Sequence, residues 1–505
     1  MNITMLLEMA SSGFADRVAV QEGDSSLTYA QLFAAAGSAA RALRESGAEH
    51  LALLDSSSPA VAVALFASAW AGVPYVPLNY RLTGDELDAL LERVTPTMLV
   101  TDAERAADLT GREGITAISS ADFLEQSASG EPLAEPWAMD GDDIAILLFT
   151  SGTTGAPKAA VLRHRHLVSY IFSSVEFGGA ADSDAALVSV PPYHIAGVAS
   201  LLSSVYSARR VVQLPAFSAG EWLRLAREQQ VTNAFVVPTM LSRIIEELEN
   251  NGETDAGLPA LAALSYGGGK MPLPVIEKAM RFFPGTGFTN AYGLTETSST
   301  ITLLDPDDHR SASASDDAVV KRRLVSVGRP LPGVELQVRN DEGATLGANE
   351  SGEIYVRGEQ VSGEYLGLGT RLEGDGWFPT RDGGSIDEEG YLFIEGRVDD
   401  VIVRGGENMS PGEIEDVLLE HPSVVDVAVV GVPSVEWGEA VAAMVVARGE
   451  RPPVEDLQSL VMQRLRSSRV PGRIEFIDEL PYNETGKLLR RRVRELLADS
   501  AAAAE

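Results

Sequence analysis

The chain has 505 residues, 45% of them apolar, and a formal net charge of −33. A chain of this length and apolar content can bury more than one core, so we expect a globular protein of several structural units. Its acidic residues are spread along the whole chain, which disfavours nonspecific binding to nucleic acid and to anionic membranes.

Cysteine is absent, which excludes a disulfide framework, a thiolate nucleophile and a thiolate zinc site. Of the six histidines, only His164 and His166 lie close together in the sequence. A metal site should therefore hold a hard cation through oxygen ligands.

The sequence gives no sign of a membrane segment, since no run reaches the roughly 18 consecutive apolar residues that span a bilayer. The N-terminal MNITMLLEMA has Glu8 inside its short apolar run and lacks a basic start and a cleavage site. We therefore expect a cytoplasmic protein without stable membrane insertion.

From Leu51 to about Gly285, short apolar runs alternate with amphipathic helical patterns. Strands are predicted at LALLDSS, VPYVPLN, TMLVTD, DIAILLFT, ALVSVPP, RVVQLP, NAFVVPT and LSYGGG, and helices at segments such as GEWLRLAREQQ, TMLSRIIEELENN and PLPVIEKAMRFF. This alternation predicts an α/β protein with parallel sheets covered by helices.

The character of the sequence changes after Gly328. Short strands between Gly, Pro and acidic turns predict a β-rich subdomain over about 328–396, and residues 397–505 mix a hairpin, helices and strands, as in an α+β unit. The first helix of that unit is marked by Ser410 as N-cap, Pro411 at its first position and Glu413 as the far half of a capping box. We expect an N-terminal domain over 1–396 and a small C-terminal domain over 397–505.

The segment FTSGTTGAPK, from Phe149 to Lys158, directly follows the apolar strand DIAILLF. Its backbone N–H groups and hydroxyls can surround phosphate oxygens while Lys158 offsets their charge. It does not fit the Walker pattern, because a proline precedes the lysine and Ala159 follows it. Taken alone, the segment would be read as a flexible turn.

Seven further segments accompany this loop: PPYHIAGV, YGGGKMP, NAYGLTET, GEIYVRG, WFPTRDGG, GRVDDVIVRGGENMSPGEIE and PYNETGK. Together with SGTTGAPK, their order and spacing resemble the adenylate-forming superfamily of acyl-CoA synthetases, peptide-synthetase adenylation domains and luciferases. The resemblance covers nearly the whole chain, from Leu27 onward. It implies a large N-terminal domain of helix-covered sheets, a small mobile C-terminal domain, and an acid activated by ATP as an acyl-AMP.

The resemblance also implies a nucleotide and metal site. Thr150 and Glu296 would bind a magnesium ion that bridges the ATP phosphates. Tyr292 resembles the residue that stacks on adenine, and Asp382 and Arg397 resemble the ribose contacts. The implied nucleotide site comprises Thr150, Ser151, Gly152, Thr153, Thr154, Gly155, Lys158, Gly267, Gly268, Gly269, Asn290, Ala291, Tyr292, Gly293, Asp382, Ile394 and Arg397.

Lys487, in PYNETGK, resembles the lysine that bridges the acid carboxylate and the α-phosphate. Attack of a carboxylate on a phosphoryl group that already carries several negative charges depends on positioning and charge stabilisation, which a lysine and magnesium supply. The implied catalytic residues are Lys487, His194, Thr295 and Glu296.

The second half-reaction needs a thiol at the adenylate carbonyl. The family rotates its C-terminal domain about a hinge that matches Asp399, which withdraws Lys487 and presents the strand VRGGEN. Similarity of RGGENMSPGEIE to acyl-CoA synthetases implies that coenzyme A is the thiol. The implied CoA-binding residues are Arg404, Gly405, Gly406 and Glu407, although the glycine pair can equally form a hairpin turn.

The acid itself is predicted from the implied acyl pocket, which comprises His194, Val198, Phe235 and Tyr266. These side chains are largely apolar, and the only candidate cation for a second carboxylate is Lys270, so we expect an apolar monocarboxylic acid. No acidic residue in YHIAG could hold an α-ammonium group, which argues against amino-acid substrates.

The chain departs from the family pattern at three places. Thr380-Arg381-Asp382 replaces the usual T-G-D, Ala159 stands where a glycine commonly follows the lysine, and Ser468-Arg469-Val470-Pro471 lacks the common aromatic-lysine pair. An arginine beside the ribose contact could crowd the nucleotide or change the backbone. One hypothesis is therefore an enzyme impaired in adenylation, which mainly forms thioesters from a supplied acyl-AMP.

The main prediction is an ATP-dependent, AMP-forming acid:CoA ligase that uses magnesium. Its partners would be the acid and coenzyme A, without nucleic acid, and a homodimer is left open. Its nearest alternative is an acyl-AMP ligase that loads a carrier protein; a luciferase-like oxygenase and a non-catalytic scaffold are weaker alternatives. A serine hydrolase and a dinucleotide oxidoreductase are disfavoured, because G-x-S-x-G and G-x-G-x-x-G after a strand are both absent.

Overall fold

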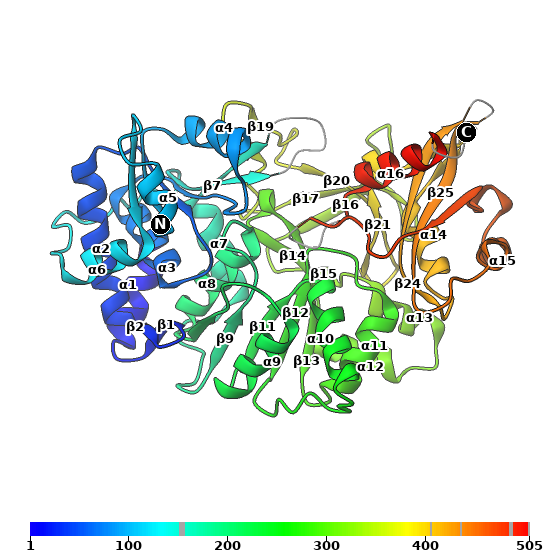
Figure 1. The fold of residues 1–505 in the computed structure, drawn as a ribbon, viewed down its shortest axis with the longest axis horizontal. Coiled ribbons are helices and arrows are strands. Elements are labelled where there is room, and N and C mark those ends of the chain that lie inside the picture. Colours follow the sequence, from blue (N-terminus) through cyan, green and yellow to red (C-terminus); the bar gives the residue numbers. More distant parts are fainter. Residues whose placement is uncertain (151–156, 405–406, 435–436, 484–487, 503–505) are drawn as a thin grey trace.

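The computed structural model describes residues 1–150, 157–404, 407–434, 437–483 and 488–502. The molecule is elongated (Figure 1), with α2 and α6 at one end of its longest axis and the C-terminal strands and helices at the other. Four sheets organise the chain in these ranges.

The largest sheet has nine strands in the order β15-β14-β13-β12-β11-β9-β10-β1-β2. Its central strands run parallel, because helices connect them, whereas β2, β14 and β15 pair antiparallel. Its strands are β1 (Val18–Glu22), β2 (Ser25–Thr28), β9 (Ala185–Val188), β10 (Arg210–Gln213), β11 (Asn233–Val236), β12 (Ala263–Gly267), β13 (Gly287–Leu294), β14 (Ser299–Leu304) and β15 (Arg329–Pro330).

A second sheet has eight strands in the order β19-β18-β8-β7-β4-β3-β5-β6. Its centre is parallel, while β7 and β8 form an antiparallel hairpin. Its strands are β3 (His50–Leu54), β4 (Tyr75–Pro77), β5 (Thr97–Thr101), β6 (Ile115–Ser119), β7 (Ile144–Thr150), β8 (Lys158–Arg163), β18 (Glu364–Tyr365) and β19 (Gly369–Thr370).

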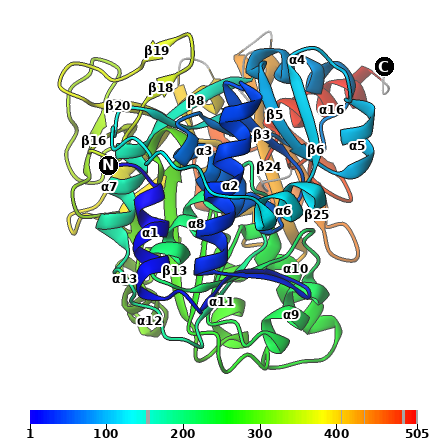
Figure 2. The ribbon, with the colours of Figure 1, turned by 90° about the vertical axis from the view of Figure 1, so that its left-hand side faces the viewer.

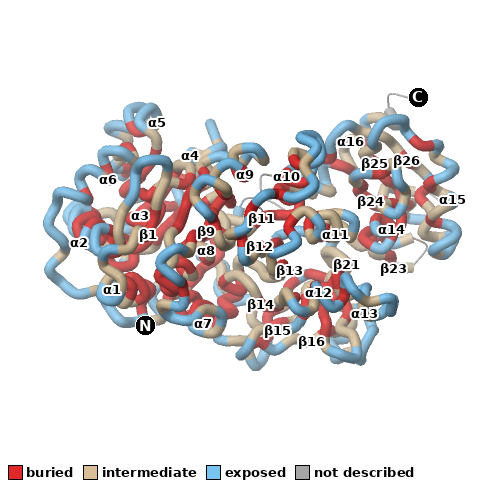
Figure 3. The backbone as a smooth tube through the Cα atoms, turned by 90° about the horizontal axis from the view of Figure 1, so that it is seen from below, coloured by how far each residue is buried: buried red, intermediate tan, exposed pale blue. Residues whose placement is uncertain are grey.

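Helix α3 (Pro59–Ala71) packs against β1 and β2 of the first sheet and against β3 and β4 of the second. All of its residues are buried. Its sequence PAVAVALFASAWA is apolar on every face, as a helix enclosed on all sides requires. The two sheets and this helix therefore share one core, and the buried residues follow the strands while the outer faces of α2, α5 and α6 are exposed (Figure 3).

The other helices of this part cover the sheets from outside, and α1 and α2 lie side by side in Figure 2. They are α1 (Thr4–Gly13), α2 (Tyr29–Ser46), α4 (Gly84–Val94), α5 (Ala103–Asp108), α6 (Ser120–Ser129), α7 (His164–Ser174), α8 (Ile195–Tyr206), α9 (Ala219–Glu228), α10 (Pro238–Asn250), α11 (Leu273–Phe282), α12 (Pro306–Ala314) and α13 (Ala318–Arg322). Short 3-10 helices follow at η1 (Thr295–Thr297) and η2 (Arg323–Val325).

The predicted β-rich region forms a four-stranded antiparallel sheet in the order β16-β17-β20-β21. Its strands are β16 (Glu335–Arg339), β17 (Gly352–Arg357), β20 (Phe378–Ile386) and β21 (Leu392–Arg397). The 3-10 helix η3 (Val398–Asp400) connects β21 to the C-terminal part. The boundary predicted at residues 396 and 397 thus falls at the end of β21.

The C-terminal part has its own sheet and its own apolar clusters. It contains β22 (Ile402–Arg404), β23 (Glu407–Met409), α14 (Pro411–Leu418), β24 (Val424–Ser434), β25 (Gly438–Ala447), α15 (Val454–Arg464), η4 (Ser467–Arg469), β26 (Arg473–Phe476) and α16 (Arg490–Ala502). The predicted α/β fold class, with a smaller α+β C-terminal unit, is confirmed.

The capping box predicted for α14 is not formed. The Ser410 side chain makes no cap hydrogen bond; its hydroxyl donates to the backbone oxygen of Glu395 in β21 at 2.6 Å. The Glu413 carboxylate forms an ion pair with Arg469, with its Oε2 3.4 Å from Arg469 Nε. Tertiary partners thus replace the local cap.

Among the helices in the described ranges, none is both long and apolar enough to cross a bilayer.

Candidate active site

A cavity of about 1920 Å³ lies where the parallel strands of the nine-stranded sheet end. The segments that follow β9, β11 and β12, together with the end of β13, line it, and so do β20, β21 and part of the C-terminal unit. Ligands of open α/β sheets bind beyond the carboxyl ends of the strands, so the topology indicates a binding site here.

The phosphate loop joins the two strands of the β7–β8 hairpin. Thr150 pairs with Lys158 across the hairpin, and the Thr150 hydroxyl donates to the backbone oxygen of Lys158 at 3.3 Å. Both residues line the cavity. The predicted Ser151, Gly152, Thr153, Thr154 and Gly155 lie outside the described residues.

Glu296 lies in η1 and is buried at the cavity wall. The phenol of Tyr365 donates a hydrogen bond to its Oε1. Burial and the neighbouring carboxylate raise the pKa of Tyr365, which keeps this phenol a donor at neutral pH. In the described part of the chain, Glu296 Oε2 takes part in no hydrogen bond or ion pair, so one carboxylate oxygen is available to a cation.

A magnesium ion fits this environment. Magnesium commonly takes one or two protein carboxylates and completes its shell with phosphates and water. No group of three or more His, Cys, Asp or Glu that could hold a metal occurs among the described residues. Glu296 and Thr150 would therefore hold the ion together with the nucleotide phosphates.

Tyr365 was not predicted as a site residue. It lies far from Glu296 in sequence, and it reaches the site because β18 pairs with β8 through Tyr365 and Ala160. The Lys158 ammonium lies 5.9 Å from the centroid of the same ring. The strand pairing thus joins the lysine of the phosphate loop and the metal-site carboxylate through one aromatic residue.

The glycine triplet after β12 has two separate tasks. A side chain at Gly267 would meet the backbone oxygen of Ala291 at 2.1 Å, so this glycine permits close packing of β12 against β13. Gly268 and Gly269 line the cavity, and Gly268 has a φ of 80°. Only these two offer the side-chain-free wall that was predicted for adenine.

The predicted ribose and adenine contacts are brought together by hydrogen bonds. Asp382 is buried and accepts from the Tyr292 phenol at 2.7 Å and from Arg397 Nη1 at 3.0 Å. Burial and the Asp382 carboxylate raise the pKa of Tyr292. Arg397 Nε is buried and has no hydrogen-bond partner in the described ranges, so this cluster has donor capacity left for a ligand.

The remaining predicted nucleotide residues Asn290, Ala291, Gly293 and Ile394 also line the cavity, as does Thr295 of the predicted catalytic set. The Asn290 side chain donates to the backbone oxygen of Ser326 at 2.9 Å. It therefore ties β13 to the segment before β15.

Arg381 has a φ of 61°, in the left-handed region that a glycine adopts freely. Its guanidinium lies 2.6 Å from Asp399 Oδ1 and 3.5 Å from Glu353 Oε2, and its backbone N–H donates to Glu353. The arginine that departs from the family pattern thus keeps a glycine-like backbone and pairs with the predicted hinge residue.

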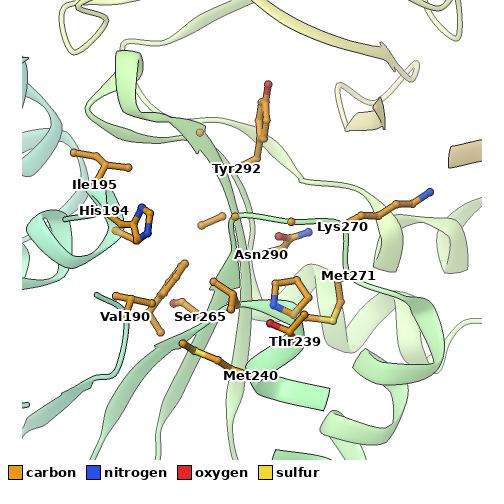
Figure 4. A pocket seen from close by; sticks show the side chains of 18 of the residues that line it. Val190, His194, Ile195, Thr239, Met240, Ser265, Lys270, Met271, Asn290 and Tyr292 are labelled. Atoms are coloured by element: carbon orange, nitrogen blue, oxygen red, sulfur yellow. The ribbon is translucent and has the colours of Figure 1, made fainter. Parts of the chain in front are cut away.

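His194 immediately precedes α8, and its side chain faces the pocket (Figure 4). Burial lowers the pKa of His194 to about 4, so the imidazole is neutral at physiological pH. Its Nε2 is buried without a hydrogen-bond partner among the residues described. Lys270 lies on the opposite side, with its ammonium pointing away from His194.

The structure corrects two of the predicted pocket residues. Phe235 lines the cavity, but Val198 and Tyr266 belong to the core. In β12, Ser265 faces the cavity, so the next residue, Tyr266, points to the other side of the sheet. There its hydroxyl meets His309 Nε2 at 2.9 Å. Val198 lies on the face of α8 turned away from the cavity.

The C-terminal unit closes one side of the cavity. Residues 478–483, Leu488 and Arg490 line it, on both sides of Lys487, which itself lies outside the described residues. Lys270 binds this unit, with Asp416 Oδ1 at 2.6 Å and the backbone oxygen of Gly412 at 3.2 Å. Lys270 is therefore already paired with protein groups.

The predicted CoA-binding hairpin lies elsewhere on the C-terminal unit. Arg404 donates to the backbone oxygen of Ser468 at 2.6 Å, and Glu407 pairs with Arg469. Neither Arg404 nor Glu407 lines the cavity. Gly405 and Gly406 lie outside the described residues. The unit thus turns the segments around Lys487, and not this hairpin, toward the cavity.

Comparison with known proteins agrees with this geometry. The AMP-binding enzyme family matches residues 7–366, and the AMP-binding enzyme C-terminal domain matches residues 413–487. The chain belongs to the AMP-binding enzyme family.

This AMP-binding enzyme is 34% identical to the 2-succinylbenzoate–CoA ligase of Bacillus licheniformis, over 95% of the chain and 96% of that protein. It is 32% identical to the fatty acid–[acyl-carrier-protein] ligase ScoC of Streptomyces coeruleorubidus, over 93% of the chain and 91% of that protein. Both relatives are ligases, and the match spans nearly their whole length.

Solved structures show the same fold. The o-succinylbenzoate CoA synthetase MenE from Bacillus subtilis, in complex with its acyl-adenylate intermediate, has a TM-score of 0.83 and 29% identity, with 97% of each chain covered. The same synthetase with ATP and magnesium ion also has a TM-score of 0.83 and 29% identity, over 96% of this chain and 98% of that one. The family and the ligase class predicted from the sequence are confirmed, and ATP, magnesium and coenzyme A are the cofactors of these relatives.

Proposed function

We propose that this AMP-binding enzyme joins a carboxylic acid to coenzyme A through an acyl-AMP. One observation carries the proposal: a single cavity contains the metal-site carboxylate Glu296, the Tyr292–Asp382–Arg397 cluster and the histidine-lined acid pocket. An enzyme that joins a nucleotide to an acid needs these three sites side by side.

In the first step, a carboxylate oxygen of the acid attacks the α-phosphorus of ATP, and pyrophosphate leaves with the electrons of the broken P–O bond. Lys158 and Lys487 would neutralise the phosphate oxygens, and Asp382 and Arg397 would hold the ribose. Bound magnesium supplies further charge neutralisation. Because His194 is neutral, it orients the acid without opposing or attracting its charge.

In the second step, the thiol of coenzyme A attacks the acyl carbonyl and AMP leaves. Arg404 and Glu407 do not line the cavity in this arrangement, so the C-terminal unit would have to rotate about Asp399 to bring their hairpin to the adenylate. Such a rotation would move the predicted domain 397–505 against the predicted domain 1–396. A cytoplasmic location and a homodimer stay predictions from the sequence.

Thioester formation with free coenzyme A tests the proposal. The enzyme is incubated with ATP, magnesium, coenzyme A and a panel of aliphatic and aryl acids, and the products are identified by mass. We expect AMP, pyrophosphate and an acyl-CoA in equal amounts. Lys487→Ala should lower ATP–pyrophosphate exchange by about 100-fold, as for loss of a charge-stabilising donor, with a smaller effect on thioester formation from a supplied acyl-AMP.

A carrier-protein ligase is the second candidate, because ScoC is a relative. Acyl transfer to a pantetheinylated carrier protein without any acyl-CoA product would replace coenzyme A by the carrier and leave the adenylation step in place. Failure of every acid to exchange pyrophosphate would overturn the proposal itself.

A further inference from the structure

The cavity extends beyond the acid-activating site along the whole of α8. The residues of α8 that line it are Ile195, Ala196, Ala199, Ser200, Ser203 and Ser204. Their spacing of three and four places them on one face of the helix. A helix of 12 residues is about 18 Å long. We name the part of the cavity along this face, from His194 to Arg209, the acyl channel.

The chemistry of the acyl channel changes along its length. Near His194 the helix presents apolar side chains, whereas its last two turns present the hydroxyls of Ser200, Ser203 and Ser204. Ala186 and Asn233, which pair at the start of β9 and β11, also line the cavity. The α8 face of the channel is therefore apolar beside His194 and polar at its far end.

Arg209 lies at this polar end. Its backbone N–H donates to the oxygen of Ser204 at 2.8 Å, which fixes it beside the last turn of α8, and it lines the cavity. Its Nε is buried and has no hydrogen-bond partner within the described ranges. None of the carboxylates described forms an ion pair with it. The charge of Asp184 favours the cation, but burial outweighs it and lowers the pKa of Arg209.

The guanidinium of the neighbouring Arg210, in contrast, has hydrogen-bond partners within the protein. Its Nη1 donates to the side-chain oxygens of Gln21 and Gln229, each at 2.9 Å, and its Nη2 donates to the backbone oxygen of Gln229 at 2.7 Å. It does not line the cavity. Arg209 has no such side-chain partners among the described residues. Its buried Nε, without an acceptor, is unfavourable unless an anion reaches the guanidinium.

We propose that Arg209 binds a second carboxylate at the far end of the acid. This inference rests on the proposed function and specifies its substrate: an acid with an apolar body and a carboxylate at each end. The helix length, less the reach of the arginine side chain, sets the separation of the two carboxylates at roughly 10–15 Å. This acid differs from the one expected from the sequence only at its far end. Lys270, the cation considered there, is paired with Asp416.

The test compares matched acids that differ only at the far end. Decanedioic and dodecanedioic acid are compared with their monomethyl half-esters, and kcat/KM for acyl-CoA formation is measured by mass spectrometry. For the unmodified enzyme we expect kcat/KM to be at least about 10-fold higher for the diacids, as for a charge-assisted hydrogen bond.

Substitution of the arginine should change this preference. Arg209→Met should lower the ratio of diacid to half-ester kcat/KM about 10- to 100-fold, because it removes the cation and keeps a long side chain. Arg209→Lys should restore part of the ratio. Arg210→Met is the matched control, since it removes a neighbouring cation outside the channel and should leave the ratio as it is.

The possible failures are distinguishable. If the unmodified enzyme prefers the half-esters or shows no preference, the anion site is refuted, even where Arg209→Met does not fold. If Arg209→Met lowers kcat/KM equally for diacids and half-esters, the arginine is structural. If no acid of either kind yields an acyl-CoA, the proposed function fails, and the question of its far end does not arise.

Discussion

At the residue scale, burial decides the protonation state of side chains around the cavity. It keeps His194 neutral at physiological pH and raises the pKa of Tyr365 further above that range. The neutral state of His194 does not follow from the residue type alone, because an exposed histidine titrates near neutrality. In the proposed function the acid would therefore meet a neutral histidine, and Glu296 accepts a hydrogen bond from the Tyr365 phenol.

Asp426 of β24 allows the effect of burial on a carboxyl pKa to be tested. Burial raises its pKa from the ordinary 3.8 to about 6, although the Tyr482 phenol donates to it at 2.8 Å. A carboxyl group with a raised pKa contributes stability below its unfolded pKa, and this stability is lost as the pH rises through its folded pKa. The loss should thus fall between about pH 4 and 6.

Asp426→Asn should remove this loss. The free energy of unfolding of the variant, relative to the unmodified enzyme, should rise by about 2 kcal/mol between pH 4 and pH 7. Unfolding by urea, followed by circular dichroism across this range, measures the difference. Asp24→Asn, at an exposed position, is the control; an equal change in both variants would contradict the assignment.

At the element scale, ion pairs connect η3 both to β20 and to α16. Asp399 pairs with Arg381 of β20 at 2.6 Å, while Asp400 lies 3.6 Å from Arg490 and 3.4 Å from Arg494 of α16. A rotation that turns Asp399 together with the C-terminal unit would separate its pair with Arg381, whereas the pairs of Asp400 lie within that unit and would be kept. The pair of Asp399 and Arg381 is about half exposed, so it is weak and sensitive to salt.

Removal of that pair should ease the rotation. Arg381→Ala should speed thioester formation from a supplied acyl-AMP about 2- to 5-fold at low salt, the effect of a surface ion pair. Salt should speed the unmodified enzyme and leave the variant nearly unaffected. Stopped-flow measurement of AMP release at low and high salt checks this.

Arg381→Gly distinguishes the effect of the ion pair from the effect of the backbone. Like Arg381→Ala it removes the ion pair, but it also relieves the left-handed backbone conformation. Equal effects of Gly and Ala would assign the change to the lost ion pair. A clear rise in ATP–pyrophosphate exchange with Gly alone would instead support the enzyme impaired in adenylation. No change of salt dependence in either variant would contradict the role of the ion pair at the hinge.

At the scale of the whole molecule, side-chain contacts among the described residues hold the C-terminal unit over the cavity. They include Lys270 with Asp416, Ser410 with Glu395, and Arg243 with Glu479 at 3.1 Å. The two ion pairs are exposed, so they set a preferred orientation without fixing it. This fits the rotation that we propose for the unit between the two steps of the reaction.

Lys270→Met should weaken the observed orientation. ATP–pyrophosphate exchange, for which we propose a role of Lys487, should fall about 3-fold, the effect expected for loss of a partly exposed ion pair and hydrogen bond. Lys278→Met is the matched control, because Lys278 pairs with Glu249 within the N-terminal part. A similar decrease in both variants would show that the effect is not due to docking of the C-terminal unit.

The sequence by itself determined the family, the fold class and most of the secondary structure. The strands β3 to β5 and β9 to β12 appear where apolar runs predicted them. The periodicity of apolar residues and the positions of turn-forming residues are local properties of the chain. The nucleotide site was predicted for the same reason, since each of its residues lies in a short sequence segment. Those that the structure describes line the cavity, with the exception of Gly267.

Only the tertiary structure decided which side chains face one another. Tyr365 reaches Glu296 through the pairing of β18 with β8, and Arg209 reaches the acyl channel from beyond the end of α8. Val198 and Tyr266 belong to suitable segments but point to the core. Facing partners come from strands and helices that are distant in the sequence. Their contacts are therefore set by strand register and helix orientation, which no local pattern records.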